Sequence, residues 1–199
     1  MKEIRKLDMQ FRAESQDGKM EIKGYAVVFD SPETYDYTEI IDKHALDETD
    51  MSDVVLRYNH NDSFMVLART RNRSLNLEKD EKGLMIDAKL QSDITDHKNI
   101  YNAIKSGLID KQSFAFTVTE DDYDYDTDTR IIKKIGRLFD VSVVDQPFYN
   151  ATDVSVKNQN EEFLQKRAEL RKQHEEELKE IQRKKELQEA KDKLLKILG

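Results

Sequence analysis

Apolar and polar residues alternate in short runs over the first ninety residues, with the period of two that β-strands show. The run from Ile4 to Phe11 ends before a turn signal at 16–19, and the alternation resumes from Met20 to Phe29. Further short apolar runs follow at positions 39–41, 54–58, 66–70, 75–77 and 84–90. Short strands at this spacing predict a β-sandwich or a β-barrel.

Helical patterns interrupt these strands. Apolar positions recur at helical spacing between residues 97 and 108, so we expect a helix there, with Asp93 or Thr95 as its N-cap and Gly107 at its end. Asp42 is a candidate cap for a brief helix over residues 44–46. Strand patterns return at 112–118, 131–135, 138–144 and near 154–156, and an acidic loop is expected at 121–128.

The C-terminal segment has a different pattern. From Asn158 onward Glu alternates with Lys and Arg, with no Pro and no Gly before Gly199, which predicts one long helix or two. Leu178 and Ile181 fit a heptad seam, but the apolar positions from 187 onward fit another that is out of phase. A narrow, broken seam favours pairing with a partner helix. We therefore expect a folded domain at 1–157 and a helical tail at 158–199.

Composition narrows the function classes. The 199 residues carry a net charge of −8, which lies on the first part of the chain and disfavours nucleic acid as a partner. The chain has no cysteine, which excludes disulfides, a thiol nucleophile and cysteine zinc sites. No apolar run approaches the ~20 residues that span a bilayer. We expect a soluble, intracellular protein with no membrane partner.

Three residues are candidates for hydrolytic chemistry. His60 follows an apolar strand and is either a turn residue or a catalytic base. Ser113 lies among apolar strand residues and is either a core serine bonded to the backbone or a nucleophile. Asp140 opens another apolar strand and either orients a histidine or lies at a strand edge.

Other polar groups have simpler interpretations. His44, His97 and His174 fit helical or solvated positions better than a catalytic one. The alternating carboxylates at 122–128 resemble a calcium loop but lack its central Gly and closing Glu, so we expect a solvated hairpin tip there. We predict no metal and no cofactor.

In their order along the chain, several motifs together resemble the tailed-phage prohead protease family, itself related to the herpesvirus assemblins. The resemblance covers residues 20–156 and rests on Gly24-Tyr25-Ala26-Val27-Val28-Phe29, Glu39-Ile40-Ile41 with Ala45-Leu46, Tyr58-Asn59-His60-Asn61, Ser113-Phe114-Ala115-Phe116, and Asp140-Val141-Ser142-Val143-Val144 with Pro147.

The resemblance implies an α+β, mainly β fold: a small closed β-barrel with flanking helices, here followed by the long C-terminal helix. It implies a serine endopeptidase with Ser113 as nucleophile, His60 as base and Asp140 as third member. The implied substrates are the scaffold or the scaffolding region of the major capsid protein, and the protease itself. Cleavage would take place inside the assembling procapsid.

Three positions depart from the family pattern. The family commonly has glycine where this chain has Ala115 and Ala68, and glutamate where it has Asp140. These departures keep a second hypothesis open, a catalytically silent assembly module that acts as a scaffold through its tail.

Overall fold

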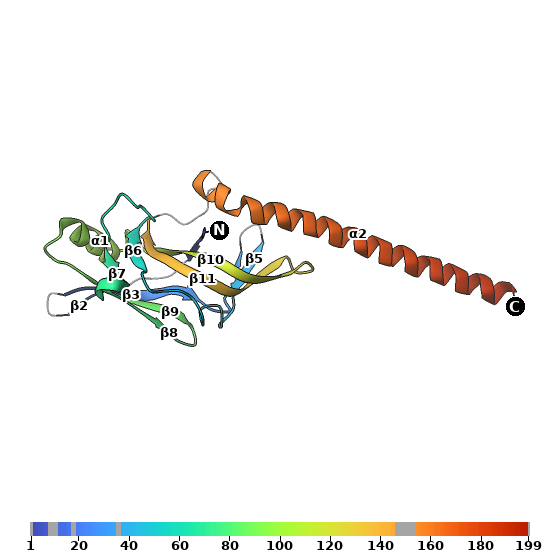
Figure 1. The fold of residues 1–199 in the computed structure, drawn as a ribbon, viewed down its shortest axis with the longest axis horizontal. Coiled ribbons are helices and arrows are strands. Elements are labelled where there is room, and N and C mark those ends of the chain that lie inside the picture. Colours follow the sequence, from blue (N-terminus) through green and yellow to red (C-terminus); the bar gives the residue numbers. More distant parts are fainter. Residues whose placement is uncertain (1, 8–11, 17–18, 35–36, 146–153, 199) are drawn as a thin grey trace. The chain divides into compact units, whose positions relative to one another are not determined.

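The computed structural model describes residues 2–7, 12–16, 19–34, 37–145 and 154–198 (Figure 1). The chain divides into two compact units, Met1–Gln159 and Asn160–Gly199. The elements are β1 (Lys2–Leu7), β2 (Arg12–Gln16), β3 (Lys19–Val28), β4 (Glu33–Thr34), β5 (Thr38–Ile41), β6 (Val55–Tyr58), β7 (Ala68–Arg69), the 3-10 turn η1 (Thr70–Asn72), β8 (Leu75–Lys79), β9 (Gly83–Leu90), α1 (Thr95–Lys105), β10 (Lys111–Asp124), β11 (Thr129–Val144) and α2 (Val154–Leu198).

The strands form two sheets. The larger has the order β1-β10-β11-β5-β4, with β6 also paired to β11 and β7 paired to β6, and the smaller has the order β2-β3-β9-β8. The long strand β11 pairs in parallel with β5 over residues 129–132 and with β6 over residues 140–143. The protein is thus mainly β with a C-terminal helix. Within the described residues no strand pairing joins the two sheets, so the closed barrel stays a prediction.

One hydrophobic core lies between the two sheets. Ile22 and Ile86 of the smaller sheet and Phe114 and Phe116 of the larger one belong to a single cluster of buried side chains. The two phenylalanine rings stack with their centroids 4.9 Å apart. Because residues 114 and 116 lie on the core face of β10, residue 113 lies on the opposite face of that strand.

Helix α1 confirms the helical pattern but not its predicted cap. Its N-cap is Ile94, which makes no side-chain cap hydrogen bond, so the prediction of Asp93 or Thr95 was wrong. Its end fits the sequence, because Gly107 has a φ of 77° and donates to the carbonyl of Ile104 at 3.0 Å. Leu108 donates to Ala103 at 2.9 Å, and the two bonds together close the helix as a Schellman motif.

Several other local predictions were wrong. Residues 43–48 form turns and not a helix, although the Asp42 carboxylate does accept from the His44 amide at 2.8 Å. The acidic loop is shorter than expected, since β10 and β11 stay paired up to Asp124 and Thr129 and the predicted hairpin tip lies between these two residues. The two strands expected at 131–135 and 138–144 are one strand, β11, and residues 154–156 lie in α2 and not in a strand.

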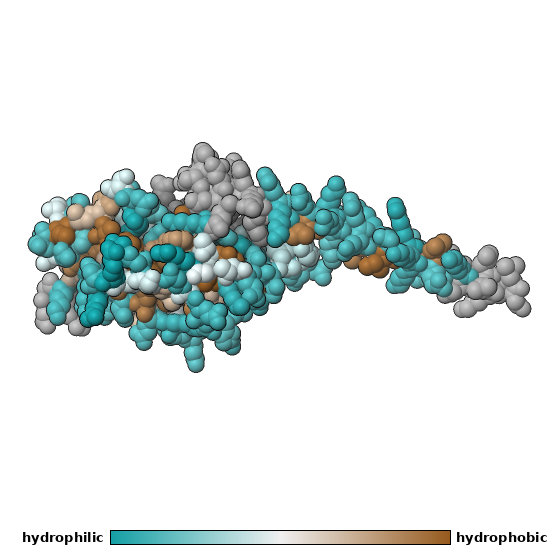
Figure 2. All heavy atoms as spheres, viewed as in Figure 1, coloured by the Kyte–Doolittle hydropathy of each residue, from teal (hydrophilic) through white to brown (hydrophobic). Residues whose placement is uncertain are grey.

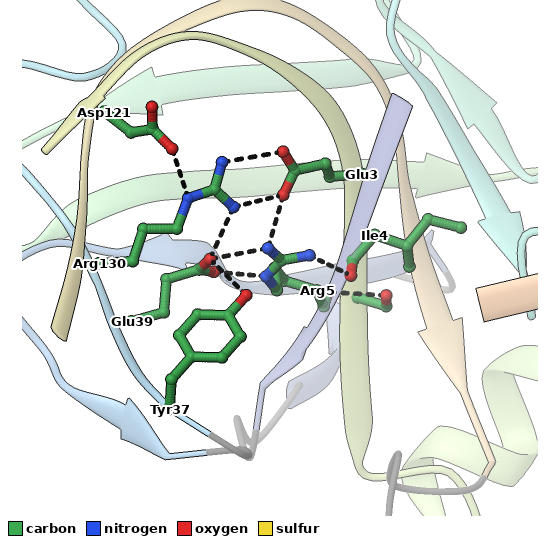
Figure 3. Close-up of polar contacts among 8 residues, drawn as sticks. Glu3, Ile4, Arg5, Tyr37, Glu39, Asp121 and Arg130 are labelled. Atoms are coloured by element: carbon green, nitrogen blue, oxygen red, sulfur yellow. Dashed lines mark hydrogen bonds and ion pairs between the residues drawn. The ribbon is translucent and has the colours of Figure 1, made fainter. Parts of the chain in front are cut away.

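A cluster of charged side chains fastens β1 to the rest of the sheet (Figure 3). The guanidinium groups of Arg5 and Arg130 each bond to both Glu3 and Glu39. Arg130 also donates to Asp121 at 2.6 Å. Both arginines and both glutamates are buried, so β1 is held beside β10 by paired charges inside the protein.

Helix α2 is one continuous helix of 45 residues. Figure 2 shows that its surface is mostly hydrophilic with isolated hydrophobic spots. Among the side chains of this helix that the structure describes, the large apolar ones that are exposed are Leu178, Ile181 and Leu187. In the described part of the chain, every helix is too short or too polar to span a bilayer.

Candidate active site

Three neighbouring strands bring His60, Ser113 and Asp140 together. On the antiparallel pair β10–β11, Ser113 lies opposite Ser142, and Ala115 lies opposite Asp140. Strand β6 runs parallel to β11 on its other side and pairs Tyr58 with Val143. The chain therefore leaves β6 next to this part of β11, and His60 follows two residues later.

The turn that carries His60 has an uncommon backbone. Asn59 and His60 both have positive φ angles, 52° and 53°. The turn is held by hydrogen bonds from the Asn59 amide to Val143 and from the Asn61 amide to Tyr58, each 3.0 Å long. Non-glycine residues in this conformation store strain and gather at functional sites, where the surrounding structure fixes them. The strain therefore marks this turn as a functional candidate independently of its histidine.

The imidazole of His60 bridges the other two candidates. Its Nε2 lies 2.6 Å from the Oγ of Ser113, and its Nδ1 lies 2.5 Å from the Oδ1 of Asp140. Ser113 is fully buried, and the side chains of His60 and Asp140 are only 12% and 4% exposed. The three groups thus form a continuous hydroxyl–imidazole–carboxylate chain that is shielded from water.

Ser113 has a second partner in the backbone. Its Oγ lies 2.7 Å from the carbonyl oxygen of Arg5, on the adjacent strand β1, and donates to it. Both interpretations of this serine thus have a contact behind them, a backbone bond and a histidine bond. A hydroxyl has one hydrogen, so His60 can accept the proton only when Ser113 turns that hydrogen away from Arg5.

Asp140 keeps its negative charge despite its burial. Burial acts to raise the pKa of this carboxyl and is the largest single influence on it. The hydrogen bond and charge of His60, the charge of Lys2 and the hydrogen bond from Ser142 act in the opposite direction, and the pKa lies below its ordinary value. An ionised carboxylate holds the hydrogen of Nδ1, which leaves Nε2 of His60 facing Ser113 as an acceptor.

Sequence reasoning missed two residues that touch this carboxylate. The hydroxyl of Ser142 lies 3.0 Å from Oδ1 of Asp140, and Nζ of Lys2 lies 3.3 Å from Oδ2. Ser142 had a usable signal, because it follows Asp140 by two residues on one strand and therefore shares its face. Lys2 had none, since its position depends on the pairing of β1 with β10, far away in sequence.

Two other histidines lie outside this constellation. The buried ring of His97 accepts from the Gln91 amide through Nδ1 and donates to the Val66 carbonyl through Nε2, both at 3.0 Å. This histidine therefore ties α1 to the neighbouring loops. The exposed ring of His44 bonds to Asp47, three residues along the chain.

The acidic run forms the tip of the β10–β11 hairpin. Its Asp124 carboxylate accepts from the Thr127 hydroxyl at 2.8 Å and the Asp126 amide at 2.9 Å, as in a tight polar turn. Nowhere in the described residues do three or more His, Asp or Glu side chains gather as metal ligands. By analogy with other serine peptidases, the loop at 145–150 is the expected place for the backbone amides of an oxyanion hole. Residues 146–150 of this loop lie outside the described residues.

Comparison with known proteins identifies the family. The family model described as the caudovirus prohead serine protease matches residues 7–166. The chain belongs to this family. The matched residues include the turn of His60 and the strands of Ser113 and Asp140. The part of the chain that holds the site therefore lies within the region that defines the prohead protease family.

Two further comparisons add little. Among solved structures, this chain is similar to the capsid assembly protease gp21 of bacteriophage T4, with a TM-score of 0.44 and 11% sequence identity. The similarity covers 72% of this chain and 98% of the gp21 chain. No curated protein matches the sequence.

Proposed function

We propose that the protein is a serine endopeptidase that cleaves a peptide bond with Ser113 as nucleophile, His60 as general base and Asp140 as the carboxylate that holds His60. The observation that carries this proposal is the position of the imidazole, within 2.6 Å of the hydroxyl and 2.5 Å of the carboxylate. Membership in the prohead serine protease family supports the same activity.

The mechanism follows from these contacts. His60 accepts the proton of Ser113 through Nε2 as the hydroxyl oxygen attacks the carbonyl carbon of the substrate. Asp140 keeps the imidazole in the required tautomer and stabilises the imidazolium that forms. His60 then gives the proton to the leaving amine, and a water molecule releases the acyl group from Ser113 by the reverse sequence.

Substitution of the nucleophile tests the proposal. Ser113→Ala should fold like the parent but lose cleavage of the phage scaffold or scaffolding region, and also lose labelling by a serine-directed fluorophosphonate. Ser74→Ala is a matched control, because it removes a hydroxyl that bonds to Arg69 and Asn72 and not to the triad. Cleavage by Ser113→Ala at the parental rate would refute the assignment. An unlabelled parent that also cleaves nothing would favour the silent assembly module.

We also propose a capsid substrate and a procapsid location. The family description places its members with the caudovirus prohead, which supports the major capsid protein, its scaffolding region and the protease itself as substrates. Cleavage of the scaffold would then take place within the assembling procapsid.

We propose residues 1–157 as the peptidase domain and residues 158–199 as an assembly tail. The two sheets share one hydrophobic core, which supports the proposal that residues 1–157 close into a small barrel. In the tail, Leu178, Ile181 and Leu187 are 50%, 62% and 57% exposed, and such apolar side chains along a charged helix support pairing with a second copy or with a scaffold helix.

A further inference from the structure

Ser142 occupies the centre of the three strands that build the site. It lies opposite Ser113 on β10 and beside Arg57 on β6, and its side chain is fully buried. Asp140 precedes it by two residues on β11, so both side chains emerge on the same face of the sheet. A buried hydroxyl at this place needs hydrogen-bond partners, and all of those it has belong to the triad.

The three contacts of Ser142 leave one arrangement of hydrogens. Its Oγ lies 3.3 Å from the backbone amide of His60, 3.0 Å from Oδ1 of Asp140 and 3.1 Å from Nδ1 of His60. The amide can only donate, so it takes a lone pair of the hydroxyl. Nδ1 must donate to Asp140 across their 2.5 Å contact, because the carboxylate is ionised. The hydrogen of Ser142 therefore goes to Asp140.

This arrangement joins the carboxylate to the backbone of the histidine. Asp140 has one methylene group between its carboxylate and the backbone, so its reach toward His60 is set by the position of β11. His60 itself stands on a strained turn, with positive φ angles at residues 59 and 60. Ser142 accepts from the strained backbone and donates to the carboxylate, so it fixes both ends of the His60–Asp140 hydrogen bond.

We propose that Ser142 is a fourth member of the site, with a positioning role. Its hydroxyl holds the carboxylate of Asp140 and the backbone of His60 at a fixed distance from each other. In this position Nδ1 of His60 keeps its hydrogen and Nε2 faces Ser113. The proposal rests on the peptidase function above and adds a residue to it. Ser142 does not touch the reacting atoms, so its loss should slow the reaction without abolishing it.

The test compares Ser142→Ala with Ser142→Thr, which keeps the hydroxyl, and with Ser74→Ala as control. Ser142→Ala should lower kcat roughly threefold to tenfold, the range that one net hydrogen bond supplies, and leave KM unchanged. Ser142→Thr should recover most of the loss. If urea unfolding shows that threonine is not tolerated, the titration described next decides alone.

A second measurement is independent of activity. Titration of the Asp140 carboxyl carbon by NMR should give a higher pKa in Ser142→Ala than in the parent, because one hydrogen bond to the charged form is lost. Ser74→Ala should leave this pKa unchanged. Parental kcat together with a parental Asp140 pKa in Ser142→Ala would overturn the positioning role. If the parent itself cleaves nothing, the peptidase proposal fails, and the Asp140 titration still decides whether Ser142 holds the carboxylate.

Discussion

Lys2 and Asp140 form an ion pair between the first strand and the site, with Nζ 3.3 Å from Oδ2. The lysine side chain is 41% exposed, whereas that of Asp140 is 4% exposed. The oxygen that Lys2 contacts is the one that does not face His60. The N-terminal strand thus places a positive charge on the outer side of the proposed triad. This charge is partly exposed to solvent, so dissolved salt screens it.

Replacement of Lys2 should therefore change the pH dependence of cleavage. The charge of Lys2 helps to keep the pKa of Asp140 below its ordinary value, so Lys2→Met should raise that pKa. A proton bound at the site leaves no base to accept the hydrogen of Ser113, and a positive charge beside the site disfavours that proton. Removal of the charge should therefore move the acid limb of kcat/KM to higher pH. The effect should be small, because the lysine is partly exposed and its charge is screened.

Salt supplies the control for this prediction. In the parent, added salt should move the acid limb in the same direction as the substitution, and in Lys2→Met it should move the limb less. Lys98→Met, which removes one exposed positive charge from α1, should behave like the parent. An acid limb that responds to salt equally in parent and Lys2→Met would show that this ion pair has no part in catalysis.

Asp140→Asn should abolish most of the activity without unfolding the protein. The amide has nearly the shape of the carboxylate, but it cannot stabilise an imidazolium and can donate to Nδ1, which favours the wrong tautomer of His60. A loss of about 10³–10⁴-fold in kcat is expected. Asp140→Glu should retain more activity than Asp140→Asn, yet less than the parent, since the 2.5 Å contact leaves little room for another methylene. Activity of Asp140→Asn within tenfold of the parent would argue against the third-member role.

The buried charge cluster should dominate the attachment of β1. Arg130→Met removes the positive charge that Arg130 places beside Glu3 and Asp121 in the parent. Loss of one member of a buried ion pair costs about 3–5 kcal/mol of unfolding free energy. Lys134→Met, which breaks an exposed pair with Glu120, should cost less than about 1 kcal/mol. Urea unfolding of the three proteins gives the comparison, and equal costs for the two variants would contradict it.

The same cluster gives stability a dependence on acid. The hydrogen bonds and charges of Arg130 and Arg5 lower the pKa of Glu3, although burial, the largest single influence, acts to raise it. A carboxyl with a lowered folded-state pKa contributes stability that is present above its unfolded-state pKa and is lost as pH falls through the folded-state value. The parent should therefore lose more stability on acidification than Arg130→Met does.

Tyr37 should make stability fall at alkaline pH. Burial, with the negative charge of Glu39 as a smaller cause, raises the pKa of this phenol to about 12. A raised folded-state pKa contributes stability that is complete below the unfolded-state value and is lost as pH rises through the folded one. Between about pH 10, the ordinary tyrosine pKa, and about 12, the parent should lose stability more steeply than Tyr37→Phe does. Urea unfolding across this pH range gives the comparison, and identical slopes for the parent and Tyr37→Phe would refute the prediction.

The sequence predicted which three side chains lie together better than it predicted the local elements around them. His60, Ser113 and Asp140 were identified because ordered motifs carry them, and the register of β6, β10 and β11 brings their side chains into contact. Lys2 was missed because its position depends on the pairing of β1 with β10, far apart in sequence. Ser142 had a signal in its spacing of two residues from Asp140, but its contacts with His60 depend on the parallel pairing of β6 with β11, which spans more than eighty residues of sequence.

The wrong local predictions have physical causes. The Asp42 side chain does cap an amide, but the Ala45 carbonyl accepts from Ile135 of β11 at 2.8 Å, so sheet contacts replace the helix that local propensity favoured. Alternating residues at 154–156 suggested a strand, yet they begin a helix that continues through the charged tail. The acidic run was expected to be a loop, but Arg130 and Lys134 offset its charge across the hairpin by bonding to Asp121 and Glu120.

Truncation tests the assembly tail. A chain that ends at Lys157 lacks the whole of the second compact unit, Asn160–Gly199, and keeps both sheets. It should therefore fold and keep peptide cleavage, but sediment as a smaller species and fail to enter procapsids.

Leu178→Ser with Ile181→Ser in the full chain should reproduce this loss, since both side chains are exposed and contribute apolar surface for a partner helix. Glu180→Gln, which breaks only an exposed pair with Lys184 on the same helix, is the matched control and should assemble normally. Unchanged sedimentation and incorporation of the truncated chain would remove the tail from assembly, whatever the activity of the first unit.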